Sequence, residues 1–219
     1  MSWNGRQFAG NWEVVWRYTL AHVQLAVVSL LLGVALALPL AYLAHRRPHT
    51  YPTLLAATNV IYAIPSIALF VLLGPLLGYT SNRPVIVAMA LYTLVILVRN
   101  TVEGLRAVPP HVVTAAIAMG YGPLRRFVAV ELPVALPGVI AGLRVATVST
   151  ISLITVGGLV GQGGIGRLFE DGFARRITQE LWAGLVAVIV LAIVADALIL
   201  LVGRRLAPWH RAERNATRA

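Results

Sequence analysis

The sequence lacks two chemically useful residue types altogether: it contains no cysteine, and all 18 of its basic residues are arginine. Without cysteine the chain can form no disulfide, no thiolate metal site and no cysteine nucleophile. Without lysine it cannot carry the phosphate loop of an ATP-binding protein, because that loop uses a lysine to reach the phosphates. No Ser/His/Asp or paired-carboxylate constellation stands out either, so the sequence indicates that the chain is not an enzyme.

Charged residues are also scarce, and their scarcity indicates the class of protein. Only 12% of the 219 residues are charged, 58% are hydrophobic, and the mean hydropathy is +0.80. An average soluble domain has about 25% charged residues, and a water-soluble fold of this size cannot bury so much apolar surface. Uncharged runs at 18–45, 48–82 and 145–166 are each long enough for a membrane span, which needs about 20 apolar residues.

We therefore predict an all-α integral membrane protein with about five spanning helices. Two shorter uncharged runs, 84–98 and 181–195, reach spanning length if one charge near the inner end is included. Pro39 and Pro65 fall within the first two predicted helices, where a proline frees a backbone carbonyl and kinks the helix. The predicted helices are 20–44, 52–77, 84–105, 137–157 and 181–203.

The distribution of arginine predicts the orientation of these helices. Arginines gather in the turn 45–49, in the long segment between the third and fourth helices and in the C-terminal tail. By the positive-inside rule the N-terminus then lies outside and the C-terminus is cytoplasmic. For the same reason the net charge of +10 reports topology, and we expect no nucleic-acid partner. The chain divides into an extracytoplasmic segment 1–19, a single transmembrane domain 20–208 with its segment 107–136 in the cytoplasm, and a cytoplasmic tail 209–219.

A glycine-rich run, GGLVGQGGIG at 157–166, contains the spacing G-x-G-x-x-G at Gly161, Gly163 and Gly166. This spacing binds dinucleotides only between the strand and the helix of a βαβ unit. Here it follows a predicted membrane helix on the external side. We therefore interpret it as a flexible, close-packed turn that joins the last two membrane helices.

Two histidines also show a spacing that can be chemically meaningful. His45 and His49 lie four residues apart, as metal ligands on a helix do, but Pro48 stands between them in a predicted turn. The two side chains need not share a face, and such short matches often mislead. A basic cytoplasmic turn is the preferred interpretation, and we expect no metal site in the chain.

The most informative segment, 114–139, lies between the third and fourth predicted helices. It reads TAAIAMGYGPLRRFVAVELPVALPGV, which is too long for a tight connection and too apolar for a disordered linker. A first short helix has an apolar face of small residues, glycines interrupt it, and a second short amphipathic piece ends at Pro133 and Pro137. A helix of this kind either fits the groove of a partner protein or rests on the lipid surface, and the residues alone leave both possibilities open.

The segment resembles the EAA loop of ABC importer permeases, whose pattern is E-A-A-x-x-x-G followed after nine residues by I-x-L-P. Thr114 stands where the family has glutamate, which removes one charge at the ATPase contact but keeps the small-residue face. The other motif positions match in kind and spacing, at Ala115, Ala116, Gly120, Val130, Leu132 and Pro133.

The resemblance extends over nearly all of residues 20–208. Four further segments look like the permeases of osmoprotectant importers, namely 64–79, 99–110, 156–166 and 191–208. The likeness implies a type I ABC importer permease fold in a bacterial or archaeal cytoplasmic (inner) membrane. It also implies a path for quaternary ammonium osmoprotectants such as glycine betaine, choline or carnitine.

The same resemblance implies the partners. Two permease subunits, identical or similar, pair in the lipid bilayer, an extracytoplasmic binding protein delivers the solute, and a cytosolic ABC ATPase dimer binds ATP and Mg. We therefore expect no cofactor in this chain. Arg125 and Arg126 contact either the ATPase or lipid phosphates. The residues implied in ATPase coupling are Thr114, Ala115, Ala116, Gly120, Gly122, Arg125 and Pro133.

Two charged residues, Arg144 and Asp196, lie deepest in the predicted helices. At 1.5 Å per residue, Arg144 is about 10 Å and Asp196 about 12 Å from the inner ends of their antiparallel helices, so the two lie at similar depth. Intramembrane charges are functional candidates and are usually paired. We predict a structural ion pair, with a proton relay as the alternative.

Uncharged polar residues on two helix faces complete the candidates. In membrane helices such side chains either bond across helix contacts or line a translocation path. Tyr62 has an added argument, because a quaternary ammonium group is attracted to the face of an aromatic ring. The candidate path residues are Asn59, Tyr62, Ser66, Thr150, Ser152 and Thr155.

Three alternative functions remain at this stage. The chain could be an ABC permease for another small, amino-acid-like solute, a secondary transporter or channel without an ATPase, or a membrane scaffold. Secondary transporters usually show internal repeats and broken helices around midplane charges, and no repeat is evident in this sequence. A scaffold would leave the segment 114–133 without a role.

Overall fold

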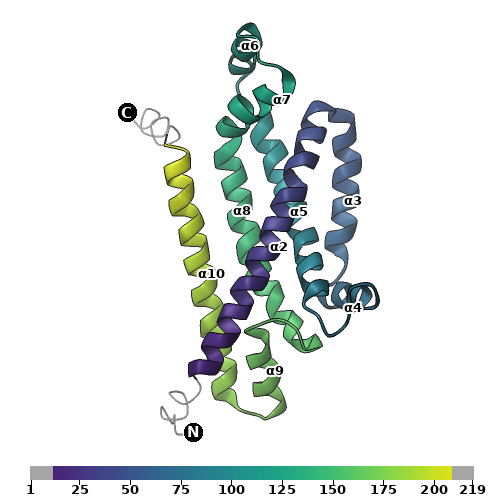
Figure 1. The fold of residues 1–219 in the computed structure, drawn as a ribbon, viewed down its shortest axis with the longest axis vertical. Coiled ribbons are helices and arrows are strands. Elements are labelled where there is room, and N and C mark those ends of the chain that lie inside the picture. Colours follow the sequence, from purple (N-terminus) through teal and green to yellow (C-terminus); the bar gives the residue numbers. More distant parts are fainter. Residues whose placement is uncertain (1–11, 209–219) are drawn as a thin grey trace.

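The computed structural model describes residues 12–208, and within this range the chain forms helices and turns and no strand (Figure 1). The predicted tail 209–219 and residues 1–11 of the predicted N-terminal segment lie outside the described residues. The long helices are α2 (Trp12–Arg46), α5 (Arg83–Arg106), α8 (Leu132–Ile154) and α10 (Thr178–Leu206). The shorter elements are α3 (Tyr51–Ala63), α4 (Ser66–Leu77), α6 (Pro110–Ala118), α7 (Pro123–Arg126), α9 (Gly166–Ala174) and the helical turns η1 (Pro48–Thr50), η2 (Phe127–Glu131) and η3 (Thr155–Val160).

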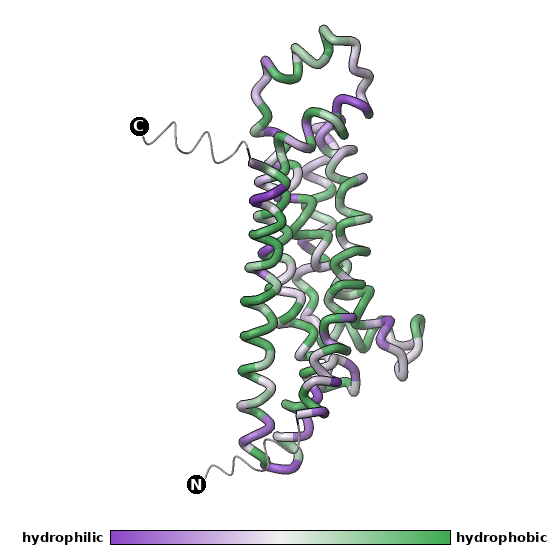
Figure 2. The backbone as a smooth tube through the Cα atoms, turned by 60° about the vertical axis from the view of Figure 1, so that its left-hand side comes forward, coloured by the Kyte–Doolittle hydropathy of each residue, from purple (hydrophilic) through white to green (hydrophobic). Residues whose placement is uncertain are grey.

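The number of membrane spans agrees with the prediction of about five. Within residues 12–208, four helical stretches are long and apolar enough to cross a membrane, and a bent pair of helices adds a fifth if it crosses as one span. Figure 2 shows the hydrophobic residues along the middle of the long helices. The four stretches are Trp12–Arg46, Arg83–Arg106, Pro123–Val160 and Thr178–Leu206.

The first span is longer than predicted, because α2 begins at Trp12 rather than at residue 20. Its 35 residues extend over roughly 52 Å, well beyond a hydrocarbon core of about 30 Å. The extra turns carry Glu13 and stacked rings of Trp12 and Trp16, 6.4 Å apart. A hydropathy pattern locates only the apolar part of a helix that lies in the bilayer. The more polar helical turns before residue 20 were therefore not predicted. Pro39 lies inside α2 as expected.

The second predicted helix, 52–77, is wrong as a single helix. The structure has two helices, α3 and α4, whose axes differ by 95°. The break falls at Ile64 and Pro65, where Ile64 is extended with φ −71° and ψ 126°. A residue before proline is pushed out of the helical region by contact with the proline ring. Pro65 therefore ends one helix and precedes the next, a larger effect than the kink we expected.

Helix α5 occupies the centre of the subunit and packs on both α2 and α8 (Figure 1). Val85, Ala88 and Met89 are completely buried, and they form a core with residues of α2, α4 and α8. Small residues let α2 and α5 approach closely, as in other membrane helix pairs. A Cβ atom added at Gly33 of α2 would lie 2.6 Å from the Cβ of Thr93. In contrast, the most apolar stretch of α10 buries no residue within the subunit.

The segment 107–136 leaves the bundle at one end and returns to it as a continuous helix. α6 and α7 form its tip, and α7, η2 and α8 then follow without interruption. We expected Pro133 and Pro137 to end the second amphipathic piece, and this expectation is wrong. Pro133 lies in the first turn of α8, directly after the π-helical turn η2, and the helix continues through it. Pro137 is tolerated inside α8.

The glycine-rich run lies at the opposite end and is close-packed, as expected, but it is more structured than a turn. Its last glycine begins the helix α9, which the sequence did not predict. Gly164 has φ +50°, and a Cβ there would lie 2.6 Å from the backbone nitrogen of His22. The G-x-G-x-x-G match at 161–166 is preceded by the helical turn η3 rather than by a strand, so the dinucleotide-binding context is missing.

The close crossing of α2 and α5 generates a stability prediction. Gly33→Leu should lower the free energy of unfolding by about 1–3 kcal/mol, because overpacking forces neighbouring atoms apart. Thr93 can move little, since it is fully buried and its hydroxyl lies 3.1 Å from that of Thr150. The thermal unfolding midpoint of the purified protein in detergent measures the effect. Ala35→Leu, on the exposed side of α2, is the control, and an equal effect of both changes would contradict the prediction.

Candidate functional site

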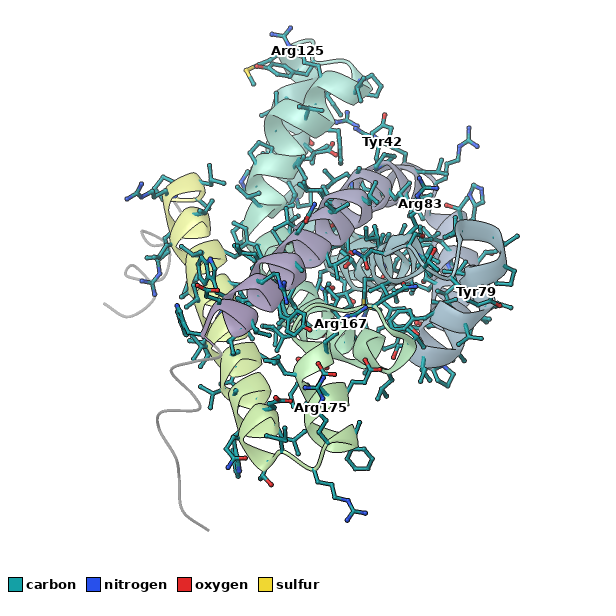
Figure 3. All side chains as sticks on the ribbon, turned by 60° about the horizontal axis from the view of Figure 1, so that its bottom comes forward. Tyr42, Tyr79, Arg83, Arg125, Arg167 and Arg175 are labelled. Carbon is teal, nitrogen blue, oxygen red and sulfur yellow. The ribbon has the colours of Figure 1, made fainter. Side chains whose placement is uncertain are left out.

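The tip of the segment 107–136 exposes large apolar side chains. Ile117, Met119 and Leu124 are 54%, 67% and 64% exposed. The other side of α6 faces inward, where Val112 and Val113 pack against a small core around Phe127. Figure 3 shows Arg125 at the outer end of this tip. An apolar surface on a short helix outside the bundle is typical of a contact with another protein.

The residues predicted for coupling divide between this surface and its support. Thr114, Ala115, Gly120, Gly122 and Arg125 are exposed at the tip, whereas Ala116 is buried and Pro133 is half-buried. Gly120 has φ +79°, a conformation that L-residues with a side chain rarely adopt, so a glycine suits the end of α6.

The two adjacent arginines have different environments. The guanidinium group of Arg125 stacks over the ring of Tyr121, 4.5 Å from its centre, and the residue remains exposed. Arg126 turns inward, and its Nε donates a hydrogen bond of 2.7 Å to Glu131. Only Arg125 therefore remains a candidate for contact with a partner or with lipid.

The sequence interpretation missed Glu131. Its side chain is 1% exposed, and three basic groups surround its carboxylate, at 2.7 Å (Arg126 Nε), 3.4 Å (Arg46 Nη2) and 3.3 Å (His45 Nε2). His45, the residue considered as a metal ligand, thus faces a carboxylate. A signal was present in the sequence, since Glu131 is the only acidic residue between Glu103 and Glu170, and a lone carboxylate beside arginines suggests an ion pair.

Arg144 and Asp196 meet in the structure. Nε and Nη2 of Arg144 donate to Oδ1 and Oδ2 of Asp196, both at 2.7 Å, which is the bidentate geometry of a strong pair. The pair joins α8 to α10, two helices that also pack against each other. Because arginine keeps its proton, a proton relay would have to run through Asp196 alone.

The candidate path residues fall into two groups. Asn59 and Tyr62 are exposed and Ser66 is half-buried, all near the break between α3 and α4. The ring of Tyr62 lies 5.4 Å from that of Tyr92, and the Tyr92 hydroxyl donates to the carbonyl of Ile64 at the break. Two aromatic rings therefore lie together where the chain bends.

The second group lies on α8 and η3. Thr150 is 2% exposed and pairs with Thr93 of α5, so it belongs to the helix contacts rather than to an open surface. Ser152 is exposed, and the Thr155 hydroxyl donates to the Ser152 carbonyl at 2.5 Å. Of these three, only Ser152 is exposed.

The opposite end of the bundle is held by buried polar contacts. His22 is completely buried, and its Nε2 donates to the carbonyl of Ile151 at 3.0 Å. The Gln162 amide donates to the carbonyl of Tyr79. Figure 3 shows Tyr79 and Arg167 on this side of the molecule. The first bond ties α2 to α8, and the second ties the glycine-rich run to the loop before α5.

Apolar spanning helices, paired intramembrane charges and a protruding tip define a multi-pass membrane protein with an exposed apolar surface at one end. The chain belongs to the family of binding-protein-dependent transport system inner membrane components, whose sequence profile matches residues 29–208. It is therefore a non-catalytic permease subunit of a bacterial ABC importer, and ATP hydrolysis lies in a partner ATPase. Membership also implies a binding-protein partner.

Individual relatives cover most of the chain. The choline transport system permease protein OpuBB of Bacillus subtilis (strain 168) is 32% identical over 190 residues, 87% of this chain and 87% of that protein. The osmoprotectant import permease protein OsmW of Salmonella typhimurium is 33% identical over 185 residues, 83% of this chain and 86% of that protein. The family resemblance drawn from the sequence is thereby confirmed.

A solved structure shows the same fold. A chain of the MetNI methionine ABC transporter in an inward-facing conformation superposes with a TM-score of 0.75 at 25% identity, over 91% of this chain and 97% of that chain. The family membership and this likeness exclude the secondary transporter and the scaffold as alternatives. The amino-acid-like solute is considered below.

The ion pair between α8 and α10 yields a charge-swap prediction. Arg144→Asp or Asp196→Arg alone places two like charges within hydrogen-bonding distance inside the membrane, so each should lower the thermal unfolding midpoint and the amount of protein in the membrane. The double swap should restore most of the unfolding midpoint and most of the amount of protein in the membrane. Swapping the exposed pair Arg99–Glu103, 3.1 Å apart, is the control with little expected effect. A double swap no better than the worse single change would contradict the structural pair.

Proposed function

We propose that this permease forms the translocation path for quaternary ammonium osmoprotectants such as choline, glycine betaine or carnitine. The observation that carries the proposal is the similarity of at least 30% to a choline permease and to an osmoprotectant import permease over more than four fifths of the chain. The paired rings of Tyr62 and Tyr92 at the break between α3 and α4 supply the aromatic faces that attract a quaternary ammonium group.

The end of the molecule that carries α6 and α7 faces the cytoplasm in this proposal. Arginines at 46–47, 106, 125–126 and 204–205 gather at this end, which favours it as the inner side. Helix α2 then enters from outside at Trp12, and α10 ends inside at Leu206. Residues 107–136, the coupling segment, lie in the cytoplasm.

The tip of the coupling segment is proposed to bind the ATPase. Thr114, Ala115, Gly120 and Gly122 present a surface of small residues, flanked by the exposed side chains of Ile117 and Met119, which suits the groove of a partner better than a charged lipid surface. Two permeases, identical or similar, pair in the membrane, and closure of the ATPase dimer switches them between inward- and outward-facing states as rigid bodies.

The proposed ATPase contact predicts the effect of a single charge at the tip. Ile117→Glu should lower the recovery of the ATPase with the affinity-tagged permease by about tenfold, because a carboxylate must be buried in an apolar contact, at a cost of more than about 1 kcal/mol. The ATPase in the purified complex, quantified against the permease, is the measurement. Phe173→Glu, 82% exposed at the opposite end on α9, is the matched control. Equal recovery with both variants would contradict the contact.

The proposed substrate predicts a role for the ring of Tyr62. In proteoliposomes with the ATPase and the binding protein, Tyr62→Ala should lower choline or glycine betaine uptake roughly fivefold, equivalent to about 1 kcal/mol of cation–π attraction. Tyr62→Phe keeps the aromatic face and should keep most of the uptake. The likeness to a methionine transporter favours the alternative of an amino-acid-like solute. Import of an amino acid such as methionine, with no uptake of any quaternary amine, would support this alternative.

A further inference from the structure

Glu131 is the best-enclosed charge at the inner end of the subunit. Its carboxylate is 1% exposed and accepts the 2.7 Å bond from Arg126, the last residue of α7 in the tip. On its other side lie His45 and Arg46, the last two residues of α2. One carboxylate thus joins two parts of the chain that are more than 80 residues apart in sequence.

Arg46 reinforces this junction from the side of α2. Its Nη2 donates a 2.7 Å bond to the carbonyl of Pro123, the first residue of α7, and also lies 3.4 Å from Glu131. One turn earlier on α2, the ring of Tyr42 packs against Phe127, with centres 4.7 Å apart. The end of α2 therefore contacts the coupling segment at three positions within nine residues, Pro123, Phe127 and Glu131.

Covalent connection explains how a displacement of the tip reaches α8 but not how it reaches α2. α7, η2 and α8 form one helical stretch, so α8 follows the tip directly. α2 is far away in sequence, and at this end of the molecule it is joined to the coupling segment by the side chains just described. η2 is a single π-helical turn, and such turns are frequent at functional sites in helices.

We propose that Glu131 is the positioning residue that ties the coupling segment to α2, so that both α2 and α8 move when the ATPase displaces the tip. The inference rests on the proposed ATPase contact. Two guanidinium groups converge on this one buried carboxylate. Without the Glu131 carboxylate, the guanidinium groups of Arg46 and Arg126 repel each other and lose their shared buried counter-charge, so the junction between α2 and η2 loosens. Loss of the carboxylate leaves the exposed apolar side chains of the tip unchanged.

The test compares transport with ATP hydrolysis in the complete importer. Permease, ATPase and binding protein are reconstituted in proteoliposomes with radiolabelled choline, glycine betaine or carnitine, whichever the wild type imports. Glu131→Gln should leave ATPase recovery and basal ATP hydrolysis near the wild-type values but lower the solute imported per ATP by about fivefold or more. Glu131→Asp keeps the charge and should retain at least half of the wild-type ratio.

A matched control removes a different carboxylate. Glu103→Gln loses the same charge at the inner end of α5, in an exposed pair with Arg99, and should leave the ratio unchanged. If Glu131→Gln imports as much solute per ATP hydrolysed as the wild type, the inference is overturned. A parallel fall of uptake and hydrolysis in proportion to the complex recovered would also overturn it, because that outcome marks a stabilising role only.

The experiment also separates this inference from the proposed function. If the wild-type permease recovers no ATPase, the proposed coupling contact fails. If the wild type binds the ATPase but imports no quaternary amine, the proposed substrate fails, and the ratio is then measured with the solute that the binding protein does deliver. If wild-type transport works and Glu131→Gln couples normally, only the role of Glu131 fails.

Discussion

The packing of α5 between α2 and α8 is the constraint on which the rest of the subunit depends. A bilayer supplies no hydrophobic driving force between helices, so membrane helices associate through close packing and interhelical hydrogen bonds. Gly33 permits the approach of α2, and the pair Thr93–Thr150 joins α5 to α8. With this centre fixed, α3, α4 and α10 pack around it and keep apolar surfaces for lipid or for partner chains.

Charged residues also join helices, and they do so at different depths in the bundle. Arg144 and Asp196 neutralise each other within the spans, and Glu131 is neutralised by groups from α2 and α7 at the end of the bundle that carries the tip. In both places the charges connect helices that are far apart in sequence. The same scarcity of charge that identifies a membrane protein makes each remaining charge structurally significant, because an unpaired ion in a low-dielectric region is costly.

Motion in such a permease requires rigid connections as well as mobile ones. In the proposed coupling, the continuous stretch from α7 to α8 supplies one rigid connection, and the Glu131 junction supplies the other. The break at Pro65 and the exposed tip around Gly120 are the places where the chain departs from regular helix. The exposed apolar surface of the tip is thus separate from the contacts that join the segment to α2.

Much of the architecture was predictable because hydropathy and arginine distribution are local properties of the sequence. The uncharged runs located the spans, and the spacing of Ala115, Ala116, Gly120 and Pro133 indicated the family. The depth argument placed Arg144 opposite Asp196 because helix geometry converts residue number into distance. The start of α2 and the course of α8 past Pro133 were misjudged, since helix ends and tolerated prolines depend on neighbouring packing.

The sequence by itself determined that the chain is an all-helical membrane protein with about five spans and that it belongs to a family of permeases. These follow from composition and from short-range patterns of residues. Only the tertiary structure decided that α3 and α4 diverge by 95°, that Thr150 is a helix contact, and that Glu131 meets the end of α2. Those facts depend on how distant parts of the chain approach one another, and no local pattern of residues encodes that approach.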